Sequence, residues 1–103
     1  MRYKQYEVIL VNLDPTIGTE IQKTRPCLII SPNEMNYNNL IVAPMTSTDK
    51  DYPTRVKIDT NSFVVFDQIM TISIKRVVKK LDITLKKKDI KIIKGIIKAM
   101  LVD

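Results

Sequence analysis

The sequence predicts a mainly β domain with one helix (α+β), in which a small, strongly bent antiparallel barrel is followed by a C-terminal helix. Two observations lead to this fold class. Short apolar runs separated by turn residues fill most of the chain, and the apolar period then changes to that of a helix. The chain has 103 residues, which suits one domain over 1–103 and is too short for two.

Several short segments have the composition of buried or half-buried strands. They are residues 7–13, 26–30, 40–45, 54–59, 62–66 and 69–74. The fourth alternates, with Val56 and Ile58 on one face and Arg55 and Lys57 on the other. Because successive side chains of a strand point to opposite faces, we expect the two apolar residues to face the core. Many short strands with tight turns favour a small bent barrel over an open sheet.

Residues 86–101 have helical periodicity, with Thr84 as a candidate N-cap. Further apolar residues widen the stripe to more than half of the helix circumference. The stripe is formed by Ile90, Ile92, Ile93, Ile96, Ile97, Ala99, Met100 and Leu101. Packing on a barrel needs only one face, so the extra width indicates either a dimer contact, which we favour, or a helix covered on all sides. The opposite lysine stripe is a solvated face or a ligand site.

The charge balance points to a polyanionic partner. Seventeen Lys and Arg residues against eleven Asp and Glu residues give a net charge of +6. Such a field attracts nucleic acid and makes its binding salt-dependent through counterion release. Lysines that merely keep a small protein soluble remain the alternative on charge alone.

The residues that are missing limit the chemistry. The chain has no histidine and one cysteine, Cys27, so His-based acid–base catalysis, Ser-His or Cys-His nucleophiles and zinc clusters are excluded. Asp49 and Asp51 alternate in one loop, but a two-metal site needs more converging acids. We therefore expect no metal and no cofactor. The single cysteine, with no signal peptide and no membrane span, indicates a cytoplasmic protein.

Three polar patches at strand ends carry the candidate functional residues. Residues 15–26 read PTIGTEIQKTRP, residues 42–47 read VAPMTS, and residues 67–72 read DQIMTI. In order along the chain, and together with YPTRV at 52–56, they resemble the Pro-Thr-x-Gly-Ser-Glu…Arg-Pro, Val-x-Pro-x-Thr-Ser and Asp-Gln-Ile-Arg-Thr blocks of the MazF/PemK toxins of bacterial toxin–antitoxin systems. Single blocks are weak signals, but four ordered blocks are a strong one.

The resemblance implies an SH3-like bent barrel (PemK/CcdB-like), a homodimer and a sequence-specific endoribonuclease for single-stranded RNA. It also implies cleavage to 2′,3′-cyclic phosphate and 5′-hydroxyl ends without a metal, and inhibition by a cognate antitoxin with an acidic, disordered tail. The family's catalytic Arg and Thr correspond to Arg25 and Thr46. The candidates for RNA contact are Thr19, Glu20, Ser47 and Gln68.

The physical roles of these residues can be argued separately. A guanidinium fork in a dry cleft suits the charge that builds on phosphate oxygens as the RNA 2′-oxygen attacks, which makes Arg25 a phosphate clamp and proton donor. A guanidinium holds its proton too tightly to be a good general base, and the base stays unassigned. Thr46 can donate its hydroxyl to a phosphate oxygen. Glu20 orients Arg25, contacts a base or is a solvated loop carboxylate.

This chain departs from the family pattern at a few positions. Tyr6-Glu7 stands where Gly-Asp is common, Ser73 replaces an Asp, and Met70 stands where Arg is usual. The loss of that cation bears on cleavage preference and leaves both catalytic matches in place. Two alternatives remain: a non-enzymatic toxin of the same fold that poisons DNA gyrase, and a basic SH3-like module that binds RNA without cutting it.

Overall fold

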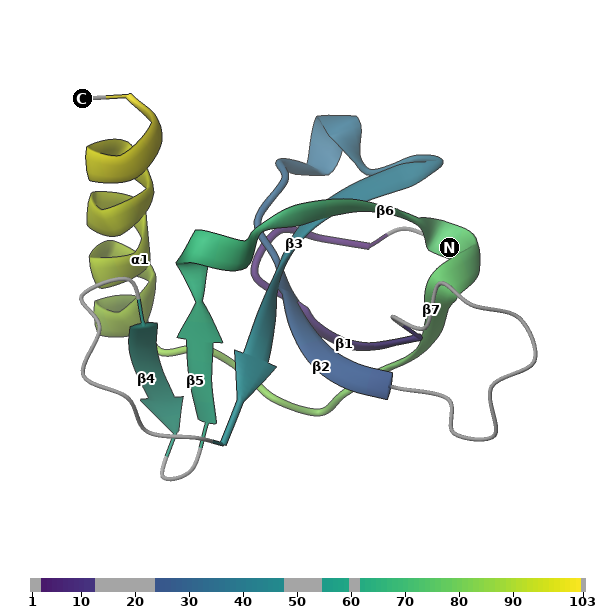
Figure 1. Ribbon diagram of the computed structural model, residues 1–103, viewed down its shortest axis with the longest axis horizontal. Helices are drawn as coiled ribbons and strands as arrows, with labels where there is room; N and C mark the ends of the chain where they lie inside the picture. Colours follow the sequence, from purple (N-terminus) through teal and green to yellow (C-terminus); the bar gives the residue numbers. More distant parts are fainter. Residues whose placement is uncertain (1–2, 13–23, 48–54, 60–61, 103) are drawn as a thin grey trace.

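The computed structural model describes residues 3–12, 24–47, 55–59 and 62–102. Seven strands form one bent sheet in which every pairing is antiparallel, and a helix follows it (Figure 1). The strands are β1 (Val8–Asn12), β2 (Thr24–Ile29), β3 (Asn39–Thr46), β4 (Arg55–Asp59), β5 (Ser62–Val65), β6 (Met70–Ser73) and β7 (Val77–Lys80). The helices are the 3-10 turns η1 (Asn33–Met35), η2 (Phe66–Gln68) and η3 (Ile74–Arg76) and the α-helix α1 (Lys87–Leu101). The predicted fold class is confirmed.

The bend of the sheet arises at the central strand, β3. The strands lie in the order β4-β5-β3-β2-β1-β7, and β6 pairs with β3 outside this path. One edge of β3 pairs with β2, whereas the other edge pairs first with β6, over Asn39–Val42, and then with β5, over Met45–Thr46. The chain passes from β5 to β6 through η2. The last residues of β3 therefore lie beyond the end of its pairing with β6 and pair with β5 instead.

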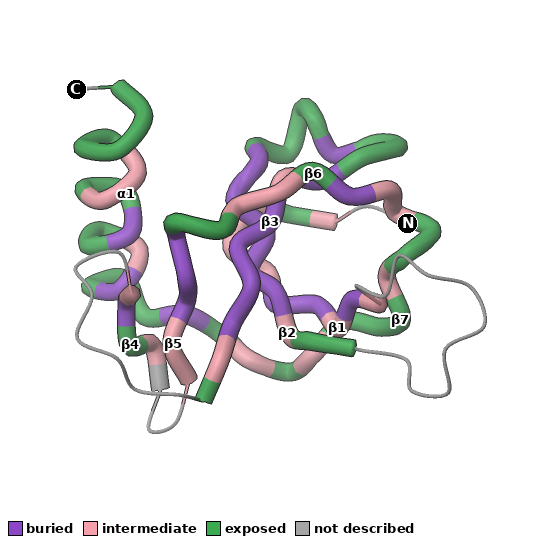
Figure 2. The backbone as a smooth tube through the Cα atoms, in the orientation of Figure 1, coloured by how far each residue is buried: buried purple, intermediate pink, exposed green. Residues whose placement is uncertain are grey.

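Two apolar clusters cover the two faces of the strands. Val8, Leu28 and Ala43 belong to a cluster that includes Ile93 of α1, and their neighbours Ile9 and Cys27 belong to the other. All six residues are at most 1% exposed. Figure 2 shows the buried backbone of β1, β2 and β3 at the centre of the sheet. Burial on both faces explains why these strands read as continuous apolar runs instead of alternating patterns.

The helix α1 packs beside β4 and exposes part of its apolar stripe. Ile93 is fully buried, and Ile90, Ile96 and Ile97 pack against the same cluster. Ile92 is 51% exposed and Leu101 60% exposed, so the expectation of a helix covered on all sides is wrong for the single chain. The four lysines of the opposite stripe are exposed, as a solvated face requires; they are Lys87, Lys91, Lys94 and Lys98.

Two further details differ from the sequence-based expectation. The helix begins at Lys87 and its N-cap position is Lys86, without a side-chain capping bond, so Thr84 is not the cap. Asp89, buried in the first turn, supplies the negative charge that favours a helix N-terminus instead. Strand β7 was not predicted because two of its four residues are lysines.

Among the described helices, none is long and apolar enough to cross a membrane.

Candidate functional site

A cavity of about 290 Å³ opens at the point along β3 where its hydrogen-bonded neighbour changes from β6 to β5. Five strands and the 3-10 turn η2 contribute to its wall. It is lined by Arg25, Pro44, Met45, Thr46, Arg55, Val65, Gln68 and Met70. We call it the arginine cavity. Arg25, Thr46 and Gln68, which lie in three separate sequence blocks, are thus brought to one place by the fold.

Arg25 is held by the pairing of β2 with β1. It is the second residue of β2, lies opposite Val11, and has an exposed side chain. Pro26 follows it and disfavours helical geometry at Arg25, which keeps the backbone extended at the mouth of the strand. The guanidinium is therefore presented by a rigid strand, although its own side chain remains accessible to a ligand.

Thr46 is the last residue of β3 and lies opposite Phe63 of β5. Its side chain is half-buried, whereas that of Ser47 is exposed and lies outside the lining of the arginine cavity. Gln68 ends η2 and is exposed. The hydroxyl of Thr46 and the amide of Gln68 supply neutral hydrogen-bonding groups beside the charge of Arg25.

Two of the sequence-predicted contact residues, Thr19 and Glu20, lie outside the described residues. Met70 lines the cavity, so the position where the family usually has an arginine belongs to this site. Sequence reasoning missed Arg55, which was placed only on the outer face of its strand. The alternation of Arg55 with the buried Val56 correctly placed Arg55 on the face of β4 away from the core. Nothing in the sequence of β4 indicated that this face lines the same cavity as Arg25.

The charge of the arginine cavity is positive. Two guanidinium groups line it, and none of its described lining residues is acidic. Cys27, behind Arg25, is fully buried, and its thiol donates to the Arg25 carbonyl at 3.7 Å. Burial raises the pKa of this thiol to about 12, and the charge of Arg25 acts in the opposite direction. The thiol is therefore protonated near neutral pH and is not a nucleophile.

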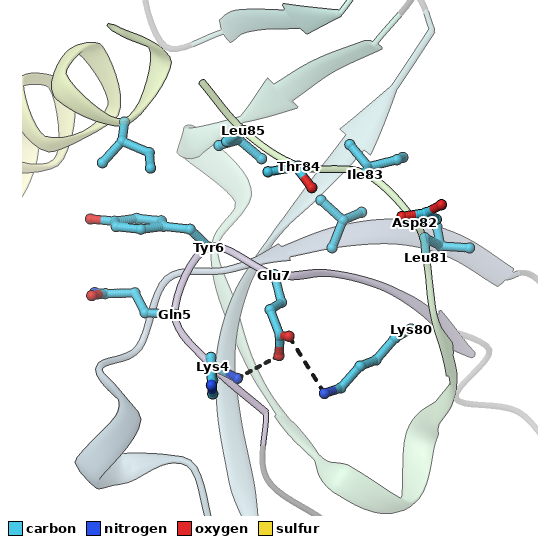
Figure 3. A pocket seen from close by; sticks show the side chains of 12 residues that line it. Lys4, Gln5, Tyr6, Glu7, Lys80, Leu81, Asp82, Ile83, Thr84 and Leu85 are labelled. Atoms are coloured by element: carbon cyan, nitrogen blue, oxygen red, sulfur yellow. Dashed lines mark hydrogen bonds and ion pairs between the residues drawn. The ribbon is translucent and has the colours of Figure 1, made fainter. Parts of the chain in front are cut away.

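Two considerably larger cavities carry mixed charges. One, of about 450 Å³, lies between the residues before β1, the end of β7 and the start of α1 (Figure 3). In it Glu7 accepts from the backbone N–H of Lys4 at 2.7 Å and pairs with Lys80 at 3.4 Å. The other, of about 470 Å³, includes Asp82 and Asp89 among its lysines. Carboxylates repel a phosphate, so the smaller arginine cavity suits an anion better.

The residues described along the chain contain no group of three or more cysteine or carboxylate side chains that could hold a metal ion. The candidate site consists instead of guanidinium, hydroxyl and amide donors at the end of a bent β sheet. Donors of this kind bind oxyanions, and phosphate in particular. The fold and the site together define a small, basic β protein with a positively charged cavity that is suited to an anion.

Comparison with known proteins gives the family. Residues 4–101 match the model of the PemK-like, MazF-like toxins of type II toxin–antitoxin systems, so the chain belongs to that family. No curated protein sequence matches it. Among solved structures, it is similar to a MazE–MazF structure from Deinococcus radiodurans, with a TM-score of 0.82 and 20% identity, over 98% of this chain and 97% of that chain.

A second similar structure is an endoribonuclease in complex with its cognate antitoxin from a mycobacterial species. The TM-score is 0.79 at 18% identity, and the match covers 96% of this chain and 94% of that chain. At such identities the likeness concerns the fold. The order of strands and the position of the helix are therefore shared although four of five residues differ.

Proposed function

We propose that this toxin is an endoribonuclease that cleaves single-stranded RNA in the cytoplasm without a metal ion. The observation that carries the proposal is that Arg25 and Thr46, separated along the chain, line one positively charged cavity. A solved structure of the same fold is described as an endoribonuclease, which supports the same activity here. Gln68 in the cavity wall, Ser47 next to it, and Thr19 and Glu20 before β2 are the residues we assign to RNA contact.

The proposed reaction uses the 2′-hydroxyl of RNA as its nucleophile. The 2′-oxygen forms a bond to phosphorus and loses its proton to solvent water, while the bond from phosphorus to the 5′-oxygen breaks and that oxygen gains a proton from Arg25. The products are a 2′,3′-cyclic phosphate and a 5′-hydroxyl end. Arg25 donates to a phosphate oxygen as negative charge builds on it, delivers a proton to the departing 5′-oxygen and regains that proton from solvent water. Thr46 donates its hydroxyl to a phosphate oxygen.

Two partners follow from this proposal. One partner is a cognate antitoxin, which we place over the site; the antitoxin complexes among similar structures support the partner itself. An acidic, disordered tail suits a surface with a net charge of +6. A second copy of the chain covers the apolar end of α1, where Met100 and Leu101 are exposed.

The test is cleavage of a long single-stranded RNA by purified protein in the presence of EDTA. We expect discrete cuts, and we expect Arg25→Ala to lower the rate on the order of 10²–10³-fold, as for the loss of one transition-state donor. Arg76→Ala is the matched control, because Arg76 is also exposed and lies outside the arginine cavity. Double-stranded RNA should resist, since its bases cannot splay out.

Other outcomes would assign another function. Full activity of Arg25→Ala removes Arg25 from the mechanism, and cleavage that EDTA abolishes contradicts the metal-free reaction. Salt-sensitive binding without cuts indicates an RNA-binding module, and gyrase inhibition without RNA loss indicates a gyrase poison.

A further inference from the structure

The arginine cavity contains a guanidinium that the reaction proposed above does not use. Arg55 is the first residue of β4 and pairs with Val65 of β5, whose side chain lines the same cavity. The next residue, Val56, is 5% exposed and belongs to the core. Because a strand alternates, burial of Val56 fixes Arg55 on the opposite face.

Arg25 and Arg55 reach the cavity from different parts of the sheet. In the strand order β4-β5-β3-β2, Arg55 comes from β4 and Arg25 from β2, and Thr46 lies on β3 between them. The fold therefore brings one guanidinium to the cavity from each side of the strand that carries the Thr46 hydroxyl. Met70, from β6, lines the same wall and is uncharged, so the second cation of this cavity comes from β4.

The two arginines differ in burial. Arg25 is exposed, whereas Arg55 is half-buried and its Nε atom is buried. A partly buried guanidinium loses less conformational entropy when it binds a ligand, because packing already restricts its rotamers. It also interacts more strongly with an anion than an exposed one, since the local dielectric constant is lower.

We propose that Arg55 is a second phosphate-binding residue of this site and acts on the scissile phosphate together with Arg25. The inference rests on the proposed ribonuclease function. As the 2′-oxygen bonds to phosphorus, charge grows on both non-bridging oxygens of the phosphate, and one guanidinium fork cannot enclose both from opposite sides. Arg25 donates to one oxygen and Arg55 to the other. No proton or bond change is assigned to Arg55.

This role predicts a characteristic kinetic effect. The charge that Arg55 stabilises is larger in the transition state than in bound RNA, so its loss should lower kcat more than it raises KM. We expect Arg55→Gln to lower kcat on the order of 10²-fold, the lower end of the range for one lost donor. Arg55→Lys keeps the charge but not the planar fork, and should recover only part of that loss.

The experiment measures single-turnover and steady-state cleavage of a short RNA that contains one mapped cleavage site. The matched control is Lys57→Gln, which removes one positive charge from the same strand at an exposed position outside the arginine cavity. This control should weaken RNA binding only through the general loss of counterion release and leave kcat unchanged. Circular dichroism and thermal unfolding of every variant confirm that it is folded.

A chemical rescue separates direct contact from a structural role. Arg55→Ala should regain activity when methylguanidine is added at millimolar concentrations, because the small cation can occupy the vacated position, and Arg25→Ala measured beside it gives the rescue expected for a direct phosphate contact. A folded Arg55→Gln protein with unchanged kcat, or an Arg55→Ala protein that shows no rescue although Arg25→Ala does, overturns the inference while the ribonuclease proposal stands. If the unmodified protein makes no cuts, the ribonuclease proposal itself has failed.

Discussion

The backbone N–H of Tyr6 donates to the carbonyl of Ile29 at 2.7 Å, and Tyr6 has a φ of 70°. This is a left-handed conformation, which costs a residue with a side chain roughly 1–2 kcal/mol. The hydrogen bond extends the pairing of β1 with β2 by one step before β1 begins. The ring of Tyr6 packs against the cluster that contains Val8 and Ile93, and this contact offsets the backbone cost.

A comparison of Tyr6→Gly with Tyr6→Ala isolates the backbone cost. Both variants lose the ring, but only glycine adopts a positive φ without a penalty. We expect the glycine variant to be more stable than the alanine variant by about 1 kcal/mol, the reverse of their usual order inside a strand. Urea unfolding with equal m-values measures the difference. If the alanine variant is equally or more stable, Tyr6 is not left-handed in solution.

The same position explains one departure from the family pattern. The family commonly has Gly-Asp where this chain has Tyr6-Glu7, and the conformation of Tyr6 is one that glycine adopts freely. The carboxylate of Glu7 accepts from the Lys4 amide and pairs with Lys80 (Figure 3). In this chain a tyrosine therefore holds a backbone conformation that would cost a glycine less.

A buried polar group fixes the turn that follows β2. Asn36, 2% exposed, donates from its amide to the carbonyls of Tyr3 and Ser31 at 3.1 and 3.2 Å, and the Ser31 hydroxyl donates to its amide oxygen. The hydroxyl oxygen of Ser31 in turn accepts a hydrogen bond from the backbone N–H of Ile41 at 3.1 Å. We expect Asn36→Leu to destabilise the protein by about 2–4 kcal/mol, because buried partners lose their hydrogen bonds. Denaturant unfolding measures it, with exposed Asn38→Leu as the control.

The sequence predicted most strands and the helix to within one or two residues, because polar residues interrupt the apolar runs at their ends. The change of neighbour from β6 to β5 along one edge of β3 could not be predicted, since strand pairing depends on contacts between distant segments. That change of neighbour creates the arginine cavity. Arg25 and Thr46 were found through their sequence blocks, whereas Arg55, on a strand with an ordinary alternating pattern, needed the tertiary structure.

The buried thiol of Cys27 should make stability fall in alkaline solution. Its pKa is raised from 9.0 to about 12 by burial, so above pH 9 the unfolded chain releases a proton that the folded chain keeps. The free energy of unfolding should then fall by up to about 1.4 kcal/mol per pH unit, and this contribution should be constant below pH 9. Burial also raises the pKa of Tyr6, so the measurement uses a Tyr6→Phe background.

Urea unfolding across this pH range, with and without Cys27→Val, checks the effect of the thiol. The valine variant should show the shallower dependence on pH. Native protein should also react with a thiol reagent only as fast as it opens, because Cys27 is 0% exposed. Rapid labelling of the folded protein would contradict the buried position.

Thr46 offers a test of the hydroxyl at the end of β3. Thr46→Val keeps the shape and the β-branch and removes the donor, so we expect a loss of cleavage on the order of 10²-fold with little change in stability. Thr46→Ser keeps the hydroxyl and should retain most activity. Thr71→Val is the matched control, because Thr71 is an exposed threonine of β6 that lies outside the lining of the arginine cavity. Equal activity of the valine and serine variants would show that the hydroxyl takes no part.

The exposed apolar end of α1 predicts where a second copy binds. Met100 is 39% exposed and Leu101 60% exposed, so replacing both with lysine costs the single chain little, and cations at a helix C-terminus are favourable. In a dimer that buries this patch, the same change places two ammonium groups out of water, which strongly disfavours association. Sedimentation at micromolar concentration should show the double variant at the 11.9 kDa of one chain and the unmodified protein at twice that mass. Val78→Lys, at a 56% exposed position on β7, is the matched control. If this control dissociates the dimer and the helix variant does not, the interface lies at β7.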